Sequence, residues 1–272
     1  MIRTLYRPAV FQGNLSSSGY FEGWYFKQVS ADLSRVYAFI PGIALEEERY
    51  AFIQVINGIT GATFFVRYPL SAFSAEKNRF DVRIGDSRFT ESFVELGIDS
   101  EEIGVSGRLE FSDTSPYPAR LLSPGIMGWY SFVPRMECRH GLVSMDHAVD
   151  GRLQVREGGR GDGGRDAPGG SSGPGGIGEA HDGSGKPGGI KAPPAADDLS
   201  PPGGIAVPGA IHTVDFSGGR GYIEKDWGTS FPEAWIWMQS NNFSRPGSSF
   251  MLAIAKIPWM GRHFIGLISF LK

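Results

Sequence analysis

The sequence has only one cysteine, Cys138, so no disulfide can form within the chain and nothing indicates a secreted, cross-linked protein. Long apolar runs are also missing. The best candidate, residues 250–260, is interrupted by Lys256 and Pro258, and a membrane helix requires roughly 18–20 apolar residues. The N-terminal residues have no apolar region typical of a signal peptide. We therefore expect a soluble, cytoplasmic protein that can make peripheral contact with a membrane.

An excess of charge of one sign is absent as well. The 26 basic and 29 acidic residues leave a net charge of −3, so the whole chain offers no electrostatic basis for binding nucleic acid. Apolar residues make up 41% of the chain and charged residues 20%, which excludes wholesale disorder. Aromatic residues are abundant, with 19 Phe, 9 Tyr and 6 Trp, and this content predicts large interiors lined by rings.

No aromatic residue occurs between Phe132 and Phe216. Residues 157–204 contain 17 Gly and 7 Pro among 48 residues, a composition that cannot bury enough apolar surface to offset the entropy of ordering. Its glycine runs lack the flanking strand and helix of a phosphate-binding loop. We predict a first β unit in 1–156, a disordered insertion in 157–204, and the start of a second β unit, incomplete at its C-terminus, in 205–272.

The pattern of apolar residues predicts β-strands throughout. Residues 79–84 and 105–111 alternate with period two, as half-buried strands do. Only residues 70–77 are a candidate for a short helix. Turn signals occur at 57–58, 85–86, 112–113, 150–151 and 217–220. Many short antiparallel strands indicate an all-β barrel or sandwich. A short repeat, Gly-Tyr-x-Glu at 19–22 and 221–224, suggests that two related β units flank the insertion.

The segment 221–243, GYIEKDWGTSFPEAWIWMQSNNF, is the densest in chemical groups. In a strand, Tyr222, Glu224 and Asp226 fall on one face, and the two carboxyl groups lie roughly 7 Å apart. A carboxylic acid kept protonated in an apolar cavity can donate a proton to an alkene. The alternative is that Glu224 is solvated and that Asp226 closes a turn at residues 227–228.

Trp235 and Trp237 fall on one strand face, with Gln239 next in the series. Such a wall can bind a flat apolar ligand or stabilise a carbocation through the negative faces of the rings, but it can also be ordinary core. Gln239 and Asn241 can orient a hydroxyl group, or they can belong to a turn.

Two further clusters contain polar groups. In residues 20–27, YFEGWYFK, Glu22 and Trp24 share a face, and we expect Glu22 to be buried and paired with a Lys or Arg across the barrel. Residues 136–147 contain His140 and His147. The segment lacks a recognised metal-ligand spacing, and alternation separates the two histidines, so a polar network is favoured over a metal site.

These segments resemble the tocopherol cyclase family. The matching stretches are YFEGWYFK at 20–27, SPGIMGWYSFVPRMECRHGLVSMDH at 123–147, and the segment 221–243, whose E-K-D-W-G and F-P-x-x-W-x-W-x-Q elements are the most specific. The resemblance implies two lipocalin-like β-barrels, the second one truncated here. It also implies closure of a prenylated hydroquinone to a chromanol, without a redox cofactor or a metal. Related two-barrel proteins include carotenoid hydratases.

The resemblance and the residues together lead to one main hypothesis. We expect an enzyme that protonates an isoprenoid alkene, with Asp226 or Glu224 as proton donor and Trp227, Trp235 and Trp237 as the wall facing the cation. Tyr222, Gln239, Asn241, Glu22, Trp24, His140 and His147 are the further candidates for substrate binding. The expected partner is a prenyl quinol or another isoprenoid. The alternatives are a non-catalytic carrier of a hydrophobic molecule and an alkene hydratase.

Overall fold

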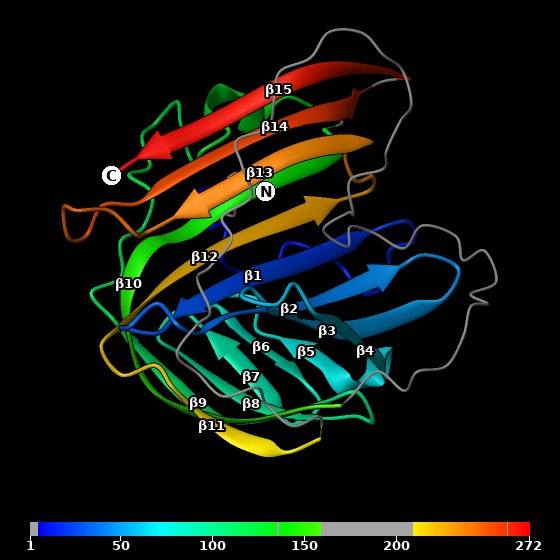
Figure 1. Ribbon diagram of the computed structural model, residues 1–272. Coiled ribbons are helices and arrows are strands. Elements are labelled where there is room, and N and C mark those ends of the chain that lie inside the picture. The colour runs from blue at the N-terminus through cyan, green and yellow to red at the C-terminus, as the bar shows by residue number, and fades with distance from the viewer. Residues whose placement is uncertain (1–4, 135, 159–208, 260) are drawn as a thin grey trace, which may run out of the picture.

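The computed structural model describes residues 5–134, 136–158, 209–259 and 261–272, and the predicted insertion lies almost entirely outside them. The described residues form two antiparallel β-sheets, which confirms the predicted all-β class (Figure 1). Two short 3-10 helices, η1 (Leu70–Ala72) and η2 (Gly128–Phe132), interrupt the strands. Among the described residues, neither helical segment has the length and apolar character that a membrane crossing requires.

The larger sheet has twelve strands. Eleven of them follow one another in the order β4-β3-β2-β1-β12-β10-β9-β8-β7-β6-β5, and β11 pairs with β10. The bounds are β1 Phe21–Val29, β2 Val36–Leu45, β3 Arg49–Asn57, β4 Thr63–Pro69, β5 Phe73–Ala75, β6 Asp81–Ile84, β7 Ser87–Thr90, β8 Phe93–Asp99, β9 Ile103–Ser112, β10 Cys138–Glu157, β11 Ile211–Asp215 and β12 Gly219–Gly228. The sheet curls around a single apolar core to which nearly all of its strands contribute (Figure 1).

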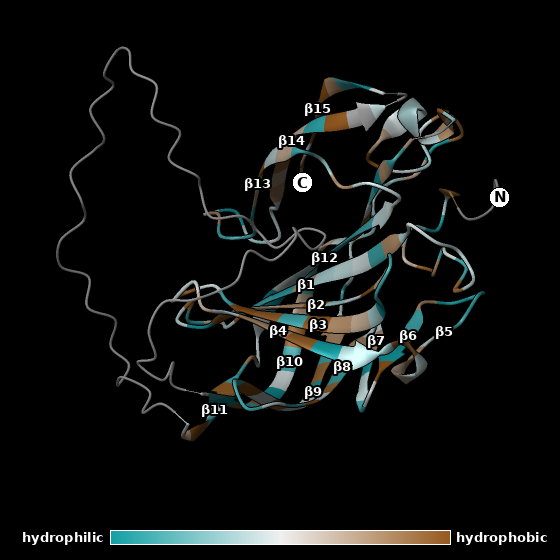
Figure 2. Cartoon of the chain, turned by 90° about the vertical axis from the view of Figure 1, so that its right-hand side faces the viewer, coloured by the Kyte–Doolittle hydropathy of each residue, from teal (hydrophilic) through white to brown (hydrophobic). Residues whose placement is uncertain are grey.

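The smaller sheet consists of β13 (Ala234–Ser240), β14 (Phe250–Trp259) and β15 (Arg262–Leu271) in that order. In both views it lies beyond β12 and β1, on the side away from β6–β9, and so covers the outer face of the large sheet (Figures 1 and 2). A second, smaller apolar cluster joins the two sheets. It contains Leu142 and Tyr222 from the large sheet and Met251 from the small one, with Trp237 packed against them.

The strand β12 lies in the large sheet, between β1 and β10, although it follows the insertion in the chain. The two copies of the Gly-Tyr-x-Glu repeat therefore lie on or beside neighbouring antiparallel strands, with Glu22 opposite Trp227. The division into units 1–156 and 205–272 stays a prediction, and the hydrogen-bonded sheet runs across it.

Two local predictions are wrong. The helix expected at 70–77 is only the single turn η1, and β5 follows it directly. The turn expected at 150–151 lies inside β10. Gly151 is needed there because its backbone has φ of 128°, and an added Cβ would clash with the carbonyl oxygen of Arg108 on β9. The alternating segment 105–111, in contrast, is confirmed as part of β9, and of the segment 79–84, residues 81–84 form β6.

Candidate functional site

A cavity of about 820 Å³ lies between the outer face of the large sheet and the inner face of the small sheet. One wall is formed by β1, β2, β3, β10 and β12, and the other by the segment leading into β13 and by β13–β15. The lining is mainly apolar and aromatic, and its polar side chains include His140, Glu224 and Asp226. Its most prominent members are Tyr25, Ile40, Phe52, Tyr130, His140, Glu224, Asp226, Phe231, Trp235, Trp237 and Phe264.

The alternation of β12 determines which of its side chains face this cavity. Glu224 and Asp226 line it, while Ile223 lies in the core of the large sheet, on the other face. The prediction that the two carboxyl groups share one face is therefore confirmed in the structure. The cavity is also apolar, as the acid hypothesis requires.

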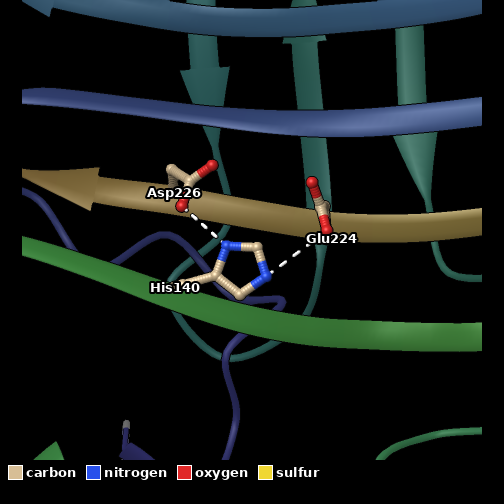
Figure 3. Close-up of side chains that lie close together, drawn as sticks. All are labelled: His140, Glu224 and Asp226. Atoms are coloured by element: carbon tan, nitrogen blue, oxygen red, sulfur yellow. Dashed lines mark hydrogen bonds and ion pairs between the residues drawn. The ribbon is translucent and has the colours of Figure 1, made fainter. Parts of the chain in front are cut away.

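His140 joins the two carboxyl groups. It lies opposite Asp226 in the β10–β12 ladder, and its Nδ1 is 2.8 Å from Oδ1 of Asp226. Its Nε2 is 3.3 Å from Oε2 of Glu224. Figure 3 shows the ring lying between the carboxyl groups, with one nitrogen directed to each. The sequence places His140 among the candidates but gives no sign of this arrangement.

The surroundings of His140 favour its charged form. Burial of the imidazole lowers its pKa, but the negative charges of Asp226 and Glu224 and the hydrogen bonds to them outweigh that effect and raise the pKa to about 10. At neutral pH the ring is therefore an imidazolium between two carboxyl groups. Such a cluster stores protons at the cavity wall.

The two carboxyl groups differ in their other partners. Glu224 accepts a hydrogen bond from the hydroxyl of Tyr222 and another from Nε1 of Trp237, at 3.2 Å. Its side chain is almost fully buried. The side chain of Asp226 is 32% exposed, and among the described residues its hydrogen-bond partner is His140. Glu224 is thus a fixed acceptor, whereas the carboxyl group of Asp226 is accessible to a molecule in the cavity.

The aromatic wall is built around Trp237. Its ring meets the ring of Tyr25 edge-on, at 5.2 Å between centroids, and Trp235 meets Phe231 in the same way at 5.4 Å. Trp235 and Trp237 both line the cavity, as the sequence suggests. Tyr25 is a member of the site that the sequence analysis missed, although its position on the opposite face from Trp24 was the available signal.

His140, Glu224 and Asp226 are also a possible set of metal ligands, since one donor atom of each lies within 4.8 Å of the others. However, each ring nitrogen faces a different carboxyl group (Figure 3). A metal ion bound to one nitrogen would therefore have one carboxylate on the far side of the ring. The arrangement suits a shared proton better than a shared cation.

Three predicted site residues lie on the other face of the sheet. The ring of Trp24 is fully buried in the large core, and its Nε1 donates to the carbonyl oxygen of Ala9. Trp227 packs over Lys225, with 4.8 Å from Nζ to the ring centroid, so it is not part of the cation-facing wall. Glu22 borders the cavity, but its carboxylate is fully buried in an ion pair with Lys225. The predicted basic partner of Glu22 is thus confirmed, on a neighbouring strand.

The other predicted residues lie beyond the cavity. His147 is fully buried, and its Nδ1 is 3.0 Å from the hydroxyl of Ser144. Gln239 and Asn241 belong to a polar network at one end of the small sheet, where Asn241 donates to Asp146 at 2.8 Å. None of the three lines the cavity. The prediction that His140 and His147 belong to separate environments agrees with this arrangement.

Comparison with known proteins confirms the predicted resemblance. A family described as tocopherol cyclase-like matches residues 203–268, which include β12, β13 and β14. No curated protein matches the chain. The crystal structure of CghA with Sch210972 is similar over 93% of this chain, with a TM-score of 0.50 and 8% identity. The chain spans 57% of the length of that protein.

An AttH protein from Nitrosomonas europaea has a TM-score of 0.46 and 11% identity, and the similarity covers 92% of this chain and 67% of that one. At these identities the CghA structure supports the fold alone. It agrees with the lipocalin-like, all-β class expected from the sequence.

Proposed function

We propose that the protein is an acid-catalysed cyclase of the tocopherol cyclase type, acting on a prenyl hydroquinone or a similar isoprenoid. The observation that carries this proposal is the His140–Asp226–Glu224 cluster at the wall of an apolar, aromatic cavity. The resemblance to the tocopherol cyclase-like family over 203–268 supports the class of reaction. A cavity of about 820 Å³ can accept a ligand with a long apolar chain.

Asp226 is the proton donor in this proposal. It lines the cavity, and its carboxyl group is more accessible than that of Glu224, which accepts from Tyr222 and Trp237. The proton comes from the His140–Asp226 pair: the imidazolium passes the shared proton to the carboxyl group of Asp226, which delivers it to the less substituted carbon of the alkene and leaves a tertiary cation. Asp226 is then a carboxylate beside a neutral imidazole, until the proton released by ring closure restores the pair.

Ring closure completes the reaction. The phenolic oxygen of the hydroquinone bonds to the cationic carbon, and the phenolic proton returns to the carboxylate of Asp226, so substrate and product are isomers. The rings of Trp235, Trp237 and Tyr25 surround the cavity where the cation forms, and their negative faces stabilise it. A mainly apolar lining favours capture by the phenol over hydration once the substrate fills the cavity.

The test is turnover of a prenylated hydroquinone by the full chain. We expect Asp226→Asn to lower kcat/KM by about 10²- to 10⁴-fold, the usual contribution of a general acid. Glu224→Gln should also lower it, because Glu224 orients His140. Glu233→Gln is the matched control, since Glu233 borders the same cavity but pairs with Lys256 outside the cluster. Wild-type rates in both Asp226→Asn and Glu224→Gln would show the assignment to be wrong.

The product distinguishes the alternatives. A cyclised product has the mass of its substrate, so chromatographic retention must be compared as well as mass. A product heavier by two hydrogens and one oxygen identifies a hydratase. A bound isoprenoid that is recovered unchanged identifies a carrier, which needs the cavity but not the acid.

A further inference from the structure

The connection between β9 and β10 exposes an unusual number of large apolar side chains. We call residues 119–134, which include η2, the η2 loop. The exposed fractions are 82% for Leu121, 75% for Leu122 and 62% for Trp129, and Tyr130 and Phe132 are also exposed. Soluble proteins rarely gather so many exposed large apolar groups in one short segment unless the segment binds something.

The backbone of this loop is held in place. The hydroxyl of Tyr6 donates to the carbonyl oxygen of Leu121 at 2.6 Å, and Nη1 of Arg139 donates to the carbonyl oxygen of Ser131 at 2.9 Å. On the other side, the ring of Tyr130 stacks on Phe264 of β15, with 5.9 Å between centroids. The exposed side chains are therefore presented by a fixed scaffold.

The loop also borders the cavity of the candidate site. Met127 and Tyr130 line that cavity, while the neighbouring Trp129 is turned outward. Figures 1 and 2 place η2 at the end of the molecule that holds the small sheet, away from β11, and Tyr130 of η2 contacts β15. The η2 loop therefore forms part of the cavity wall and part of the outer surface.

The charged residues in and near the η2 loop indicate what kind of partner it binds. Residues 119–134 contain no Asp or Glu, and Arg120 is exposed, as is Arg7 nearby. Tryptophan is enriched where proteins meet the headgroup region of a bilayer, and leucine side chains insert below that region. Exposed arginine adds attraction to anionic headgroups.

We propose that the η2 loop is a docking surface for a lipid bilayer that contains anionic lipid. Leu121, Leu122 and Trp129 enter the bilayer, and Arg120 contacts the headgroups. This proposal goes beyond the proposed function, because docking requires no turnover and holds equally for a cyclase, a hydratase or a carrier.

The experiment is sedimentation of the full chain with vesicles of phosphatidylcholine, with and without phosphatidylglycerol. We expect binding that is stronger with phosphatidylglycerol. The double variant Leu121→Ser/Leu122→Ser should lower the partition coefficient by about tenfold or more, because two apolar side chains no longer enter the bilayer. Arg120→Glu should remove most of the preference for phosphatidylglycerol. Ile211→Ser on β11 is the matched control, since Ile211 is 68% exposed and lies at the other end of the molecule.

Several outcomes would overturn the proposal. One is a wild-type protein that sediments with neither vesicle. Another is a double variant that binds like the wild type at an unchanged melting temperature. If only the double variant Ile236→Ser/Leu267→Ser lost vesicle binding, the bilayer would contact the exposed face of the small sheet and not the η2 loop. A change of oligomeric state in Leu121→Ser/Leu122→Ser, without vesicle binding by the wild type, would identify a second copy of the chain as the partner.

Discussion

His140 and Asp226 lie directly opposite each other in the β10–β12 ladder, and the ring nitrogen Nδ1 is 2.8 Å from the carboxyl oxygen. Because cross-strand neighbours on one face are only about 5 Å apart, the imidazole reaches Asp226 and, two residues along β12, Glu224. The register of two strands thus creates a three-membered proton-sharing cluster from residues that are far apart in the chain.

The first prediction concerns the pH dependence of His140. Its pKa is about 10 in the folded protein and about 6.5 in an unfolded chain. The folded state therefore binds the proton more tightly, and the resulting stabilisation is complete below pH 6.5 and is lost as the pH rises through 10. We expect the free energy of unfolding of the wild type, relative to His140→Gln, to fall by up to about 1.4 kcal/mol per pH unit between pH 7 and 10. Urea titrations over this range measure it. If the free energies of unfolding of the wild type and His140→Gln changed with pH in parallel, His140 would not be an imidazolium in the folded protein.

The second prediction concerns His147, whose effect on stability changes with pH in the opposite direction. Burial lowers the pKa of His147 to about 3, so below pH 6.5 the unfolded chain binds the proton and the folded protein does not. Stability should fall as the pH decreases from 7 towards 4, and His147→Gln should reduce this dependence. Because His147 lies away from the cavity, the same variant should leave KM for the isoprenoid unchanged. If His147→Gln raised KM at unchanged stability, His147 would be a substrate-binding residue after all.

The third prediction concerns the buried ion pair of Glu22 and Lys225. Both side chains are fully inaccessible to solvent. Lys225→Met leaves a buried carboxylate without its counter-charge and should lower the free energy of unfolding by about 3–5 kcal/mol. The double variant Glu22→Gln/Lys225→Met should recover part of that loss. Lys256→Met is the control, because Lys256 pairs with the exposed Glu233 and should cost less than about 1 kcal/mol. Equal effects of Lys225→Met and Lys256→Met in urea unfolding would argue against the buried pair.

The fourth prediction uses two glycines. A Cβ at Gly221 would overlap Nε2 of His147 and the side-chain oxygen of Gln28, so Gly221→Ala should cost about 1–3 kcal/mol. Gly125 has nothing near its own Cβ position and no positive φ, so Gly125→Ala should be close to neutral. Melting temperatures of the two variants provide the comparison. If Gly221→Ala melts like Gly125→Ala, the close packing of β12 against His147 and Gln28 is not present.

Much of the local structure could be predicted from the sequence, because period-two alternation acts within one strand. That pattern placed Glu224 and Asp226 on one face and identified Glu22 as a buried acid with a basic partner. The same alternation puts Trp227 on the face away from Glu224, so including it in the cation-facing wall went against the pattern.

The partners across strands could not be predicted in the same way. The contact between His140 and Asp226 depends on the register of β10 and β12, which no local pattern specifies. The bulges of β10 between Leu142 and His147 shift that register further. The composition of 157–204 also favoured a division of the chain into units, whereas β12 pairs with β1 across it.

The position of β12 has a consequence for how the protein folds during synthesis. β1 pairs with β2 on one edge, but β12, its partner on the other edge, is made about 200 residues later. One edge of β10 likewise has no partner until the Gly- and Pro-rich segment has been translated and β12 follows. Until then both strands have an open edge, which is a template for pairing with other chains. Sheets built from such distant pairings close slowly. These two edges therefore stay open until β12, which ends at residue 228, has emerged from the ribosome.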